Sequence, residues 1–327
     1  MPTNVQDLAC PAQPTVSVII PTYNAGPPFR ALLQALWNQS LRPHEIIVID
    51  STSSDGTAAA AETEGARVLT VDQREFDHGG TRNRAARAAS GEILVFMTQD
   101  AEPADGGLLE ALVRPLADER VACSYGRQLP RSDANVLEKL SRSFNYPAEA
   151  SRKGKADIDQ LGIKAFFCSN VCSAVRRELF VDMGGFAEPV IFNEDLFFAA
   201  QCVLAGYEIA YAAEARVVHS HNYSLKQQFK RFFDNGVSMR RNEWIYQYSS
   251  VNKAGSRLVG TQLRELHRAR KWHWIPVLIA ESGAKYLGYQ LGKRYNRLPA
   301  SWCERFSMHR KIWDKLQSMD TGVAERG

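Results

Sequence analysis

The sequence predicts an α/β fold in which helices flank a mostly parallel sheet and a helical extension follows at the C-terminus. From about residue 15 to residue 100, short apolar runs alternate with helical patterns in the order βαβαβαβ. This alternation is typical of parallel strands joined by right-handed crossovers. The chain has 327 residues, of which 45% are hydrophobic. This composition is sufficient for packed cores in about two domains, and it excludes intrinsic disorder.

The parallel region is expected to contain four strands and three helices. The first strand, residues 16–20, is an apolar run that ends at Pro21. The first helix begins behind Pro27 and Pro28 and has apolar side chains at helical spacing up to Trp37. The elements that follow are a strand at 45–50, an Ala-rich helix at 57–64 that Gly65 ends, a strand at 67–71, a helix at 81–89 and a strand at 92–97.

Polar, glycine-containing segments follow three of these strands, directly after Ile20, Asp50 and Met97. In parallel sheets, ligands bind at the carboxyl ends of the strands. We therefore expect the three segments to meet in one crevice.

The rest of the chain is less regular. Residues 151–159, SRKGKADID, are charged and polar and are expected to form a mobile loop. Beyond residue 224, segments at 226–241, 262–271 and 302–316 have the pattern of amphipathic helices rich in Arg, Lys, Trp and Tyr.

The net charge of +4 conceals an uneven distribution of charge. Residues 225–327 carry 20 Lys and Arg against 8 Asp and Glu, whereas residues 1–224 carry 20 against 28. A basic segment predicts an anionic partner, which is nucleic acid, a phosphate compound or an anionic membrane surface.

Cysteine spacing and hydropathy exclude several classes of protein. The six cysteines include no CxxC pair, so they are expected to be reduced, buried thiols rather than a disulfide framework or a zinc ribbon. The N-terminus lacks the pattern of a signal peptide, and no run of residues is apolar enough to cross a bilayer. We expect a chain that is neither exported nor integral to a membrane.

Carboxylates cluster after apolar runs, at Asp50, Asp55 and Asp100 and again at Glu194 and Asp195. A carboxylate at the end of a strand can accept a hydrogen bond from a ribose or coordinate a cation that bridges phosphates. The alternative for each residue taken singly is a helix cap or a turn.

Seven short segments between residues 15 and 224 carry these carboxylates in a distinctive order. They are VSVIIPTYN at 16–24, VIDSTSSDGT at 48–57, HGGTRNRAA at 78–86, VFMTQDAEP at 95–103, SNVCSAVRRELFVDMGGF at 169–186, NEDLFFAAQCVLAGY at 193–207 and VVHSHNYS at 217–224. Together they resemble the inverting glycosyltransferases of family 2, which have the GT-A fold with its Rossmann-like sheet. The FDHGGTRN and TQDAEP variants are most similar to bacterial rhamnosyltransferases that use dTDP-L-rhamnose.

The resemblance implies a domain division and an activity. Residues 1–224 would form the catalytic domain, with nucleotide-sugar binding in 15–103 and the acceptor side in 104–224, and residues 225–327 would form a basic helical region. The activity would be transfer of L-rhamnose, or a related hexose, from a nucleotide diphosphate sugar to a hydroxyl of a bacterial surface glycan or lipid-linked oligosaccharide, with inversion.

Three alternatives to this activity remain open. The donor could be a UDP- or GDP-hexose, or the chain could bind a nucleotide sugar without catalysis. The basic tail alone also fits a nucleic-acid-binding protein, but no base-reading motif accompanies it. We therefore expect no nucleic-acid partner.

The resemblance also assigns the donor site. Pro21, Thr22 and Asn24 would line the nucleotide pocket, Asp50 would contact the base or ribose, Asp55 and Arg82 would lie near the diphosphate, and Gln99 would complete the site.

A metal site is implied by the segment Thr98-Gln99-Asp100, which stands in place of the DxD motif of the family. Thr98 replaces the first aspartate, so Asp100 is the only charged ligand of the motif. His219 and His221, two residues apart at the end of an expected strand, could both reach the ion and compensate. The expected ion is Mg²⁺ or Mn²⁺.

For catalysis, Glu194-Asp195 matches the ED motif of the family, which makes Asp195 the general base and Glu194 its neighbour that orients the acceptor. The alternative is an exposed acidic helix start capped by Asn193. Ser169, Asn170, Gly185 and Phe186 would contact the acceptor, although Gly185 and Phe186 could equally be a turn and a core aromatic.

The tail contains Trp272-His273-Trp274 and an aromatic, basic run around Tyr286 and Arg294. Such a composition suits a helix that lies in a membrane interface. It predicts a peripheral enzyme on the cytoplasmic face of the cell membrane, with a polyprenyl-diphosphate-linked acceptor. The alternative is that these helices pack on the body or form a homodimer contact.

Overall fold

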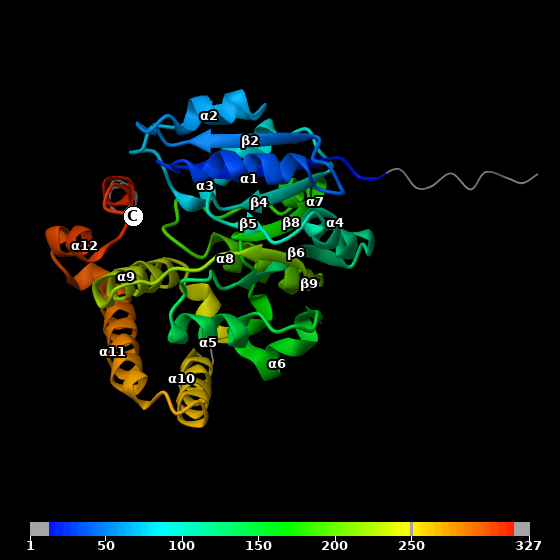
Figure 1. Cartoon of the computed structure of the whole chain (residues 1–327). Helices are drawn as coiled ribbons and strands as arrows, with labels where there is room; N and C mark the ends of the chain where they lie inside the picture. Colours follow the sequence, from blue (N-terminus) through cyan, green and yellow to red (C-terminus); the bar gives the residue numbers. More distant parts are fainter. Residues whose placement is uncertain (1–12, 249–250, 317–327) are drawn as a thin grey trace, which may run out of the picture.

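A computed structural model describes residues 13–248 and 251–316 of the chain (Figure 1). Nine strands of this part form one sheet in the order β3-β2-β1-β4-β8-β6-β9-β5, with β7 paired to β9. Helices pack on both faces of the sheet, which confirms the predicted fold class.

The first half of the sheet is parallel, as the alternating pattern predicts. β2 and β4 flank β1, and β3 pairs with the outer side of β2. These strands are β1 (Val16–Thr22), β2 (Glu45–Asp50), β3 (Arg67–Thr70) and β4 (Ile93–Met97), and the helices between them are α1 (Pro28–Trp37), α2 (Thr57–Thr63) and α3 (His78–Ala88).

The first strand does not end at Pro21, contrary to the prediction. The carbonyl of Thr22 accepts a hydrogen bond from Ser51 N (2.8 Å), so Thr22 faces β2 and Pro21 faces β4. The pairing of β1 with β4 ends at Ile19. The N–H that proline lacks is therefore not needed by any neighbouring strand, and the strand can continue.

The second half of the sheet is mixed. β8 (Cys172–Arg176) runs antiparallel to both β4 and β6 (Val121–Leu129), whereas β9 (Glu208–Val218) is parallel to β6. β5 (Glu102–Pro103) pairs antiparallel with β9. The helices of this half are α4 (Leu108–Val113), α5 (Val136–Asn145), α6 (Ile158–Leu161), α7 (Arg177–Asp182) and α8 (Glu194–Leu204).

The segment 151–159 is not the loop that its composition predicts. It begins with β7 (Ser151–Lys153), which pairs antiparallel with β9, and continues through a 3-10 turn into α6. The ammonium of Lys153 donates to the carbonyl oxygens of Phe167 (2.7 Å) and Lys164 (3.2 Å). Tertiary hydrogen bonds of this kind fix a segment whose local sequence gives no sign of order.

Two apolar cores cover the two faces of the sheet. Val18 and Ile20 of β1 belong to the core beneath α1, whereas Ile19 belongs to the core on the other face, with Phe197 of α8. Successive residues of a strand point to opposite faces, so a strand covered on both faces is apolar throughout. The five cysteines of the described residues are free and buried, as expected: Cys123, Cys168, Cys172, Cys202 and Cys303. The sixth, Cys10, lies outside the described residues.

The C-terminal region is helical, and its elements are α9 (Leu225–Arg241), α10 (Val251–Arg268), α11 (Ile275–Gly292) and α12 (Ala300–Phe306). In Figure 1, α10 and α11 extend from the end of the molecule opposite α2. None of the described helices has the length and apolar character required to cross a bilayer. The division into two domains at residue 224 stays a prediction.

The predicted helix at 302–316 is interrupted, because α12 ends at Phe306. The carboxylate of Asp234, on α9, accepts a hydrogen bond from Met308 N (2.8 Å), and the hydroxyl of Ser307 accepts one from His309 N (2.9 Å). These side chains bind backbone N–H groups that a continuous helix would use internally. The helical periodicity could not indicate this break, since Asp234 is distant in sequence.

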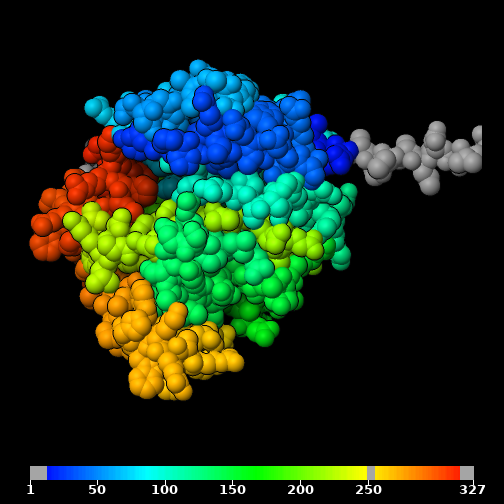
Figure 2. All heavy atoms as spheres, in the orientation of Figure 1, coloured from blue at the N-terminus to red at the C-terminus, as the bar shows by residue number. Residues whose placement is uncertain are grey.

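Beyond the break, the chain returns to the N-terminal half of the sheet. Lys315 forms an ion pair with Asp77 (2.5 Å), and Lys311 donates to the side chain of Gln73. Figure 2 shows the C-terminal residues, in red, against the blue N-terminal half. The C-terminal segment of the described chain is thus in direct contact with the segment between β3 and α3.

Helices α9 and α11 pack closely through glycines. A Cβ atom added to Gly292 would lie 2.0 Å from the carbonyl oxygen of Phe233, and one added to Gly288 would lie 2.3 Å from that of Phe229. By contrast, Gly283, also on α11, has no atom within 4 Å of such a Cβ position.

We expect Gly292→Ala to lower the free energy of unfolding by about 1–3 kcal/mol, because the methyl group forces the two helices apart. Gly283→Ala is the matched control and should raise it by about 0.5–1 kcal/mol, since alanine favours the helix. Urea denaturation of both variants measures the difference. Equal stability of the two variants would show that the close packing of α9 and α11 is unimportant.

Candidate active site

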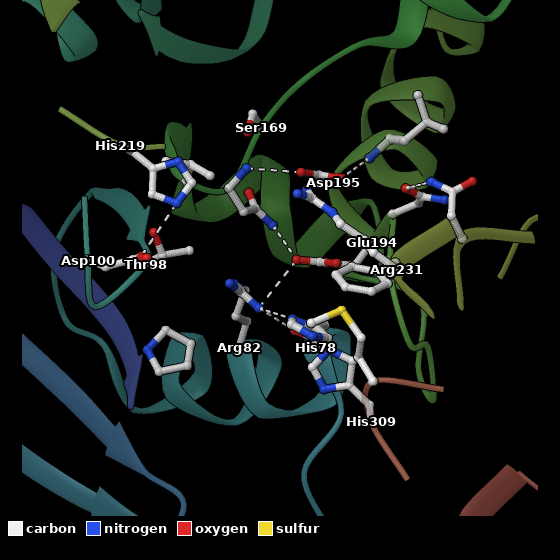
Figure 3. A pocket seen from close by; sticks show the side chains of 18 of the residues that line it. His78, Arg82, Thr98, Asp100, Ser169, Glu194, Asp195, His219, Arg231 and His309 are labelled. Atoms are coloured by element: carbon white, nitrogen blue, oxygen red, sulfur yellow. Dashed lines mark hydrogen bonds and ion pairs between the residues drawn. The ribbon is translucent and has the colours of Figure 1, made fainter. Parts of the chain in front are cut away.

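A cavity of about 1030 Å³ lies at the carboxyl ends of the parallel strands, and Figure 3 shows its side chains. As predicted, the segments after β1, β2 and β4 meet here, through Tyr23, Ser51 and Thr98. Of the predicted site residues, the structure brings the following to the cavity: Pro21, Thr22, Arg82, Gln99, Asp100, Ser169, Asn170, Glu194, Asp195, His219 and His221.

The predicted nucleotide residues that do not line the cavity belong to the loops beside it. Asp50 is buried and accepts hydrogen bonds from the hydroxyls of Thr22 (2.9 Å) and Ser53 (2.6 Å). Asp55 accepts from Gly26 N (2.9 Å), and Asn24 Oδ1 accepts from Ser54 N (2.9 Å). These bonds join the loops after β1 and β2 into one rim.

The hydrogen-bonding groups of Asp55 are satisfied within that rim. Its carboxylate accepts from the hydroxyl of Thr57 (2.6 Å), and this bond, stronger than the effect of burial, lowers the pKa of Asp55. The carboxylate is therefore a fixed anion that shapes the loop.

Asp100, His219 and His221 form one group on the cavity wall. Their ligand atoms all lie within 4.8 Å of one another. The Nε2 atoms of the two histidines are 3.1 Å apart, and those of His219 and His221 lie 3.5 Å and 3.1 Å from the oxygens of Asp100. Two imidazoles and one carboxylate that converge in this way are a ligand set for a divalent ion.

The surroundings of this group fit a bound cation. Burial alone would raise the pKa of Asp100, but its contacts with the imidazoles of His219 and His221 hold that pKa well below its usual range. Burial lowers the pKa of His219, and a neutral imidazole is the form that binds metals. The hydroxyl of Thr98, which stands in place of the missing aspartate, is buried without a hydrogen-bond partner in the described part of the chain.

Glu194 and Asp195 begin α8 and are not an exposed acidic helix start. Glu194 is 4% exposed and forms an ion pair with Arg82 of α3 (3.3 Å). Asp195 accepts hydrogen bonds from the backbone N–H groups of Asn170 (3.0 Å) and Leu196 (2.8 Å). Asn193 precedes the helix in a left-handed conformation (φ 69°) and makes no side-chain cap.

The two carboxyl groups differ in their environment. Burial, followed by the negative charge of Glu194, raises the pKa of Asp195 to about 7, against the opposing effect of its two backbone hydrogen bonds. Arg82 contacts Glu194 directly and is therefore committed to that carboxylate. The result is one carboxyl group paired with a guanidinium and one that can exchange a proton near neutral pH.

Gly185 and Phe186 are not part of the cavity. Phe186 is 4% exposed and packs against Phe96, Phe180 and Phe198, while its backbone N–H donates to Asn83 (2.9 Å). Gly185 has a positive φ (73°) in the turn before it. The alternative of a turn and a core aromatic therefore describes both residues, and a role in acceptor contact is wrong for Phe186, which is buried in the core.

The sequence missed several residues that line the cavity. His78 belongs to the HGGTRN segment and stacks on Phe192 (5.1 Å between ring centres), and burial keeps its pKa well below the usual range. Gln128 and Arg142 come from the irregular region, where no motif marked them. Arg231 of α9 and His309 of the C-terminal segment also line the cavity, although the tail was expected to be a separate unit.

Comparison with known families and proteins agrees with this geometry. Residues 17–184 match the family model of glycosyl transferase family 2. The matched region includes β1 to β8 and the group of strand ends that surrounds the cavity.

Two curated relatives match almost the whole chain. The O-antigen chain rhamnosyltransferase RfbN of Salmonella typhimurium is 41% identical over 305 residues, which cover 92% of this chain and 97% of the relative. The O-antigen chain rhamnosyltransferase WbaN of Salmonella anatum is 42% identical over 307 residues, covering 93% and 97%.

The solved structures that resemble this chain include the mannosyltransferase PcManGT of Pyrobaculum calidifontis in complex with GDP-Man and Mn²⁺. It has a TM-score of 0.57 and 22% identity, over 84% of this chain and 88% of that one. This likeness establishes the GT-A fold. With the family match and the two relatives, it shows that the chain belongs to glycosyltransferase family 2.

Proposed function

We propose that this glycosyltransferase moves L-rhamnose from a nucleotide diphosphate sugar to a hydroxyl group of a lipid-linked surface glycan, with inversion at the anomeric carbon. The observation that carries this proposal is that Asp195, a carboxyl group with a raised pKa, lines the same cavity as Asp100, His219 and His221. A proton acceptor and a site for a diphosphate-bound cation are the two functions that such a transfer requires.

Asp195 is the proposed general base. Inversion in one step requires the acceptor hydroxyl to attack the anomeric carbon directly, and the base removes its proton as the new bond forms. The backbone N–H groups of Asn170 and Leu196 hold the carboxylate of Asp195 in place. Arg82 and the amide of Asn170 (3.1 Å) both contact Oε1 of Glu194, which fixes the orientation of this carboxylate beside Asp195.

Asp100, His219 and His221 would hold the divalent ion, with Gln99 beside them in the cavity. When bound, such an ion neutralises the charge that develops on the nucleotide diphosphate as it leaves. Two imidazole ligands suit Mn²⁺ better than Mg²⁺, because Mg²⁺ prefers an all-oxygen shell. We therefore propose Mn²⁺ as the preferred ion of the two.

The proposed donor is dTDP-L-rhamnose, in keeping with the rhamnosyltransferase names of RfbN and WbaN. The buried carboxylate of Asp50 and the loop that carries Asn24 and Asp55 would form the nucleotide side of the site. Ser169 and Asn170 lie on the opposite side, next to Asp195, and are the proposed acceptor contacts.

The C-terminal helices offer a surface that suits an anionic membrane. Helix α11 packs on α9 through its glycines, but Ile279 (65% exposed) and Tyr286 (63% exposed), seven residues apart on one face, are open to solvent. Trp272 is 59% exposed. It directly follows a segment with four exposed cations that have no ion-pair partner among the described residues: Arg264, Arg268, Arg270 and Lys271. Apolar side chains beside unpaired cations are typical of peripheral membrane helices.

This surface supports a peripheral enzyme at the cytoplasmic face of the membrane that acts on a polyprenyl-diphosphate-linked acceptor. A homodimer contact at α11 is the competing use of the same residues. The two uses differ in their response to lipid.

Incubation of the enzyme and Mn²⁺ with dTDP-L-rhamnose, UDP-hexoses and GDP-hexoses, each with a lipid-linked acceptor, tests the donor. We expect dTDP release and a product heavier by one deoxyhexose with dTDP-L-rhamnose alone, measured by mass spectrometry. A higher kcat/KM with a UDP- or GDP-hexose would refute the proposed donor.

Asp195→Asn should lower kcat by roughly 100-fold or more while leaving donor binding intact, as expected for the loss of a general base. In the wild type, kcat/KM at saturating Mn²⁺ should fall about tenfold per pH unit below pH 7, because the base works only when ionised. Asp159→Asn, on the exposed face of α6, is the control. Near-normal turnover of Asp195→Asn would remove Asp195 from the mechanism.

The membrane surface is tested by flotation of the full chain with anionic or neutral liposomes. We expect binding to anionic vesicles at low salt and its loss at high salt, because salt screens the attraction. The double variant Ile279→Glu, Tyr286→Glu should lose it, whereas Val181→Glu, at an exposed apolar position of α7, should not. Wild-type protein that stays unbound at low salt, yet sediments as a dimer, would favour the dimer contact.

A further inference from the structure

Gln128 connects the candidate metal site to the core of the protein. It lies on β6 in register with Val217 of β9, so His219, directly after the end of β9, lies two residues further on the same side. Gln128 is 2% exposed, and its Oε1 lies 3.1 Å from Nδ1 of His219. The guanidinium of Arg142, on α5, donates to the same oxygen.

The orientation of the Gln128 amide follows from its partners. An arginine can only donate, so the atom that Arg142 contacts must be the amide oxygen. The amide nitrogen then faces the hydroxyls of Tyr146 (2.6 Å) and Ser169 (3.0 Å), to which it donates. The polar atoms of the buried amide are thus all satisfied.

This orientation decides which nitrogen of His219 is available to a metal. Because Oε1 of Gln128 can only accept, Nδ1 of His219 must carry the hydrogen, and Nε2 keeps its lone pair. Nε2 is the atom that faces Asp100 and His221. Arg142 is itself held by Glu138 (2.7 Å), so the second partner of the Gln128 oxygen is fixed in place.

We propose that Gln128 is a positioning residue for the metal ligand His219: its amide oxygen sets the tautomer and the ring orientation that present Nε2 to a divalent ion. The proposal rests on the proposed metal site of Asp100, His219 and His221. A hydrogen-bond acceptor behind a ligating imidazole commonly changes metal affinity by about 10–100-fold.

A purely structural role for Gln128 would be to fill the space between β6, α5 and the loop at Ser169. The two roles differ in what replaces the glutamine. Methionine has nearly the same shape but cannot accept from Nδ1, whereas glutamate retains the acceptor oxygens. Gln39 provides a matched control, because it is also a buried glutamine (6% exposed) and its amide is bonded to Ala35 O (3.0 Å) and Asp105 O (3.0 Å), away from the cavity.

The test is a Mn²⁺ titration of the full chain without donor or acceptor, in which electron paramagnetic resonance measures the free ion. We expect Gln128→Met to bind Mn²⁺ about 10–100-fold more weakly than the wild type. Gln128→Glu should bind at least as tightly as the wild type. Gln39→Met should leave the affinity unchanged, even if it lowers the melting temperature as much as Gln128→Met does.

The outcomes separate this proposal from the proposed metal site. Wild-type protein that binds no Mn²⁺ would overturn both. Wild-type binding with equal affinity in Gln128→Met would overturn the positioning role alone. If Gln128→Met does not fold, Gln128→Asn takes its place, since asparagine keeps the amide but is too short to reach His219. The same loss of Mn²⁺ affinity is expected. Wild-type affinity in Gln128→Asn would overturn the proposal.

Discussion

The site depends on the placement of two adjacent carboxyl groups in the protein interior with one cation beside them. Glu194 and Asp195 begin α8, and of these two carboxyl groups Glu194 is the one that forms an ion pair with Arg82 of α3. Burying a charge without a partner costs several kcal/mol, so the position of α3 relative to α8 is fixed by this ion pair. Burial, followed by the negative charge of Glu194, raises the pKa of Asp195 against the opposing effect of its two backbone N–H groups. The two neighbouring carboxyl groups therefore have different environments: one contacts a guanidinium, and the other contacts backbone N–H groups.

The metal group shows a similar compensation. The family pattern places an aspartate where this chain has Thr98, and a hydroxyl cannot supply the missing charge. His221 adds a ligand atom 3.1 Å from Asp100, on the same strand end as His219. In the proposed metal site, one imidazole nitrogen would thus replace one hard oxygen ligand, which would change the preference among divalent ions more than the capacity to hold one.

The extent to which the sequence predicts this structure varies along the chain. The parallel strands were predictable because a strand covered on both faces must be apolar at every position, as Val18, Ile19 and Ile20 are. The carboxylates after these strands were predictable for the same reason, since topology brings strand ends together. Strand β7 was not predictable, because it is held in place by backbone hydrogen bonds to β9 and by the hydrogen bonds of the Lys153 ammonium. Gln128 lies at the end of an irregular strand without a motif, and only the three-dimensional structure shows that its amide lies behind His219.

The return of the C-terminal segment to the cavity has a consequence for biosynthesis. Met308, His309 and Ile312 line a cavity whose other walls begin with β1, so the wall is completed by residues close to the end of the sequence. During translation, the strands of the parallel sheet leave the ribosome long before these residues are made. The nascent chain can assemble its sheet early, but it acquires the finished cavity only after residues 308–312 have been made. The order of translation itself therefore delays the moment at which a partly made chain could bind a nucleotide sugar.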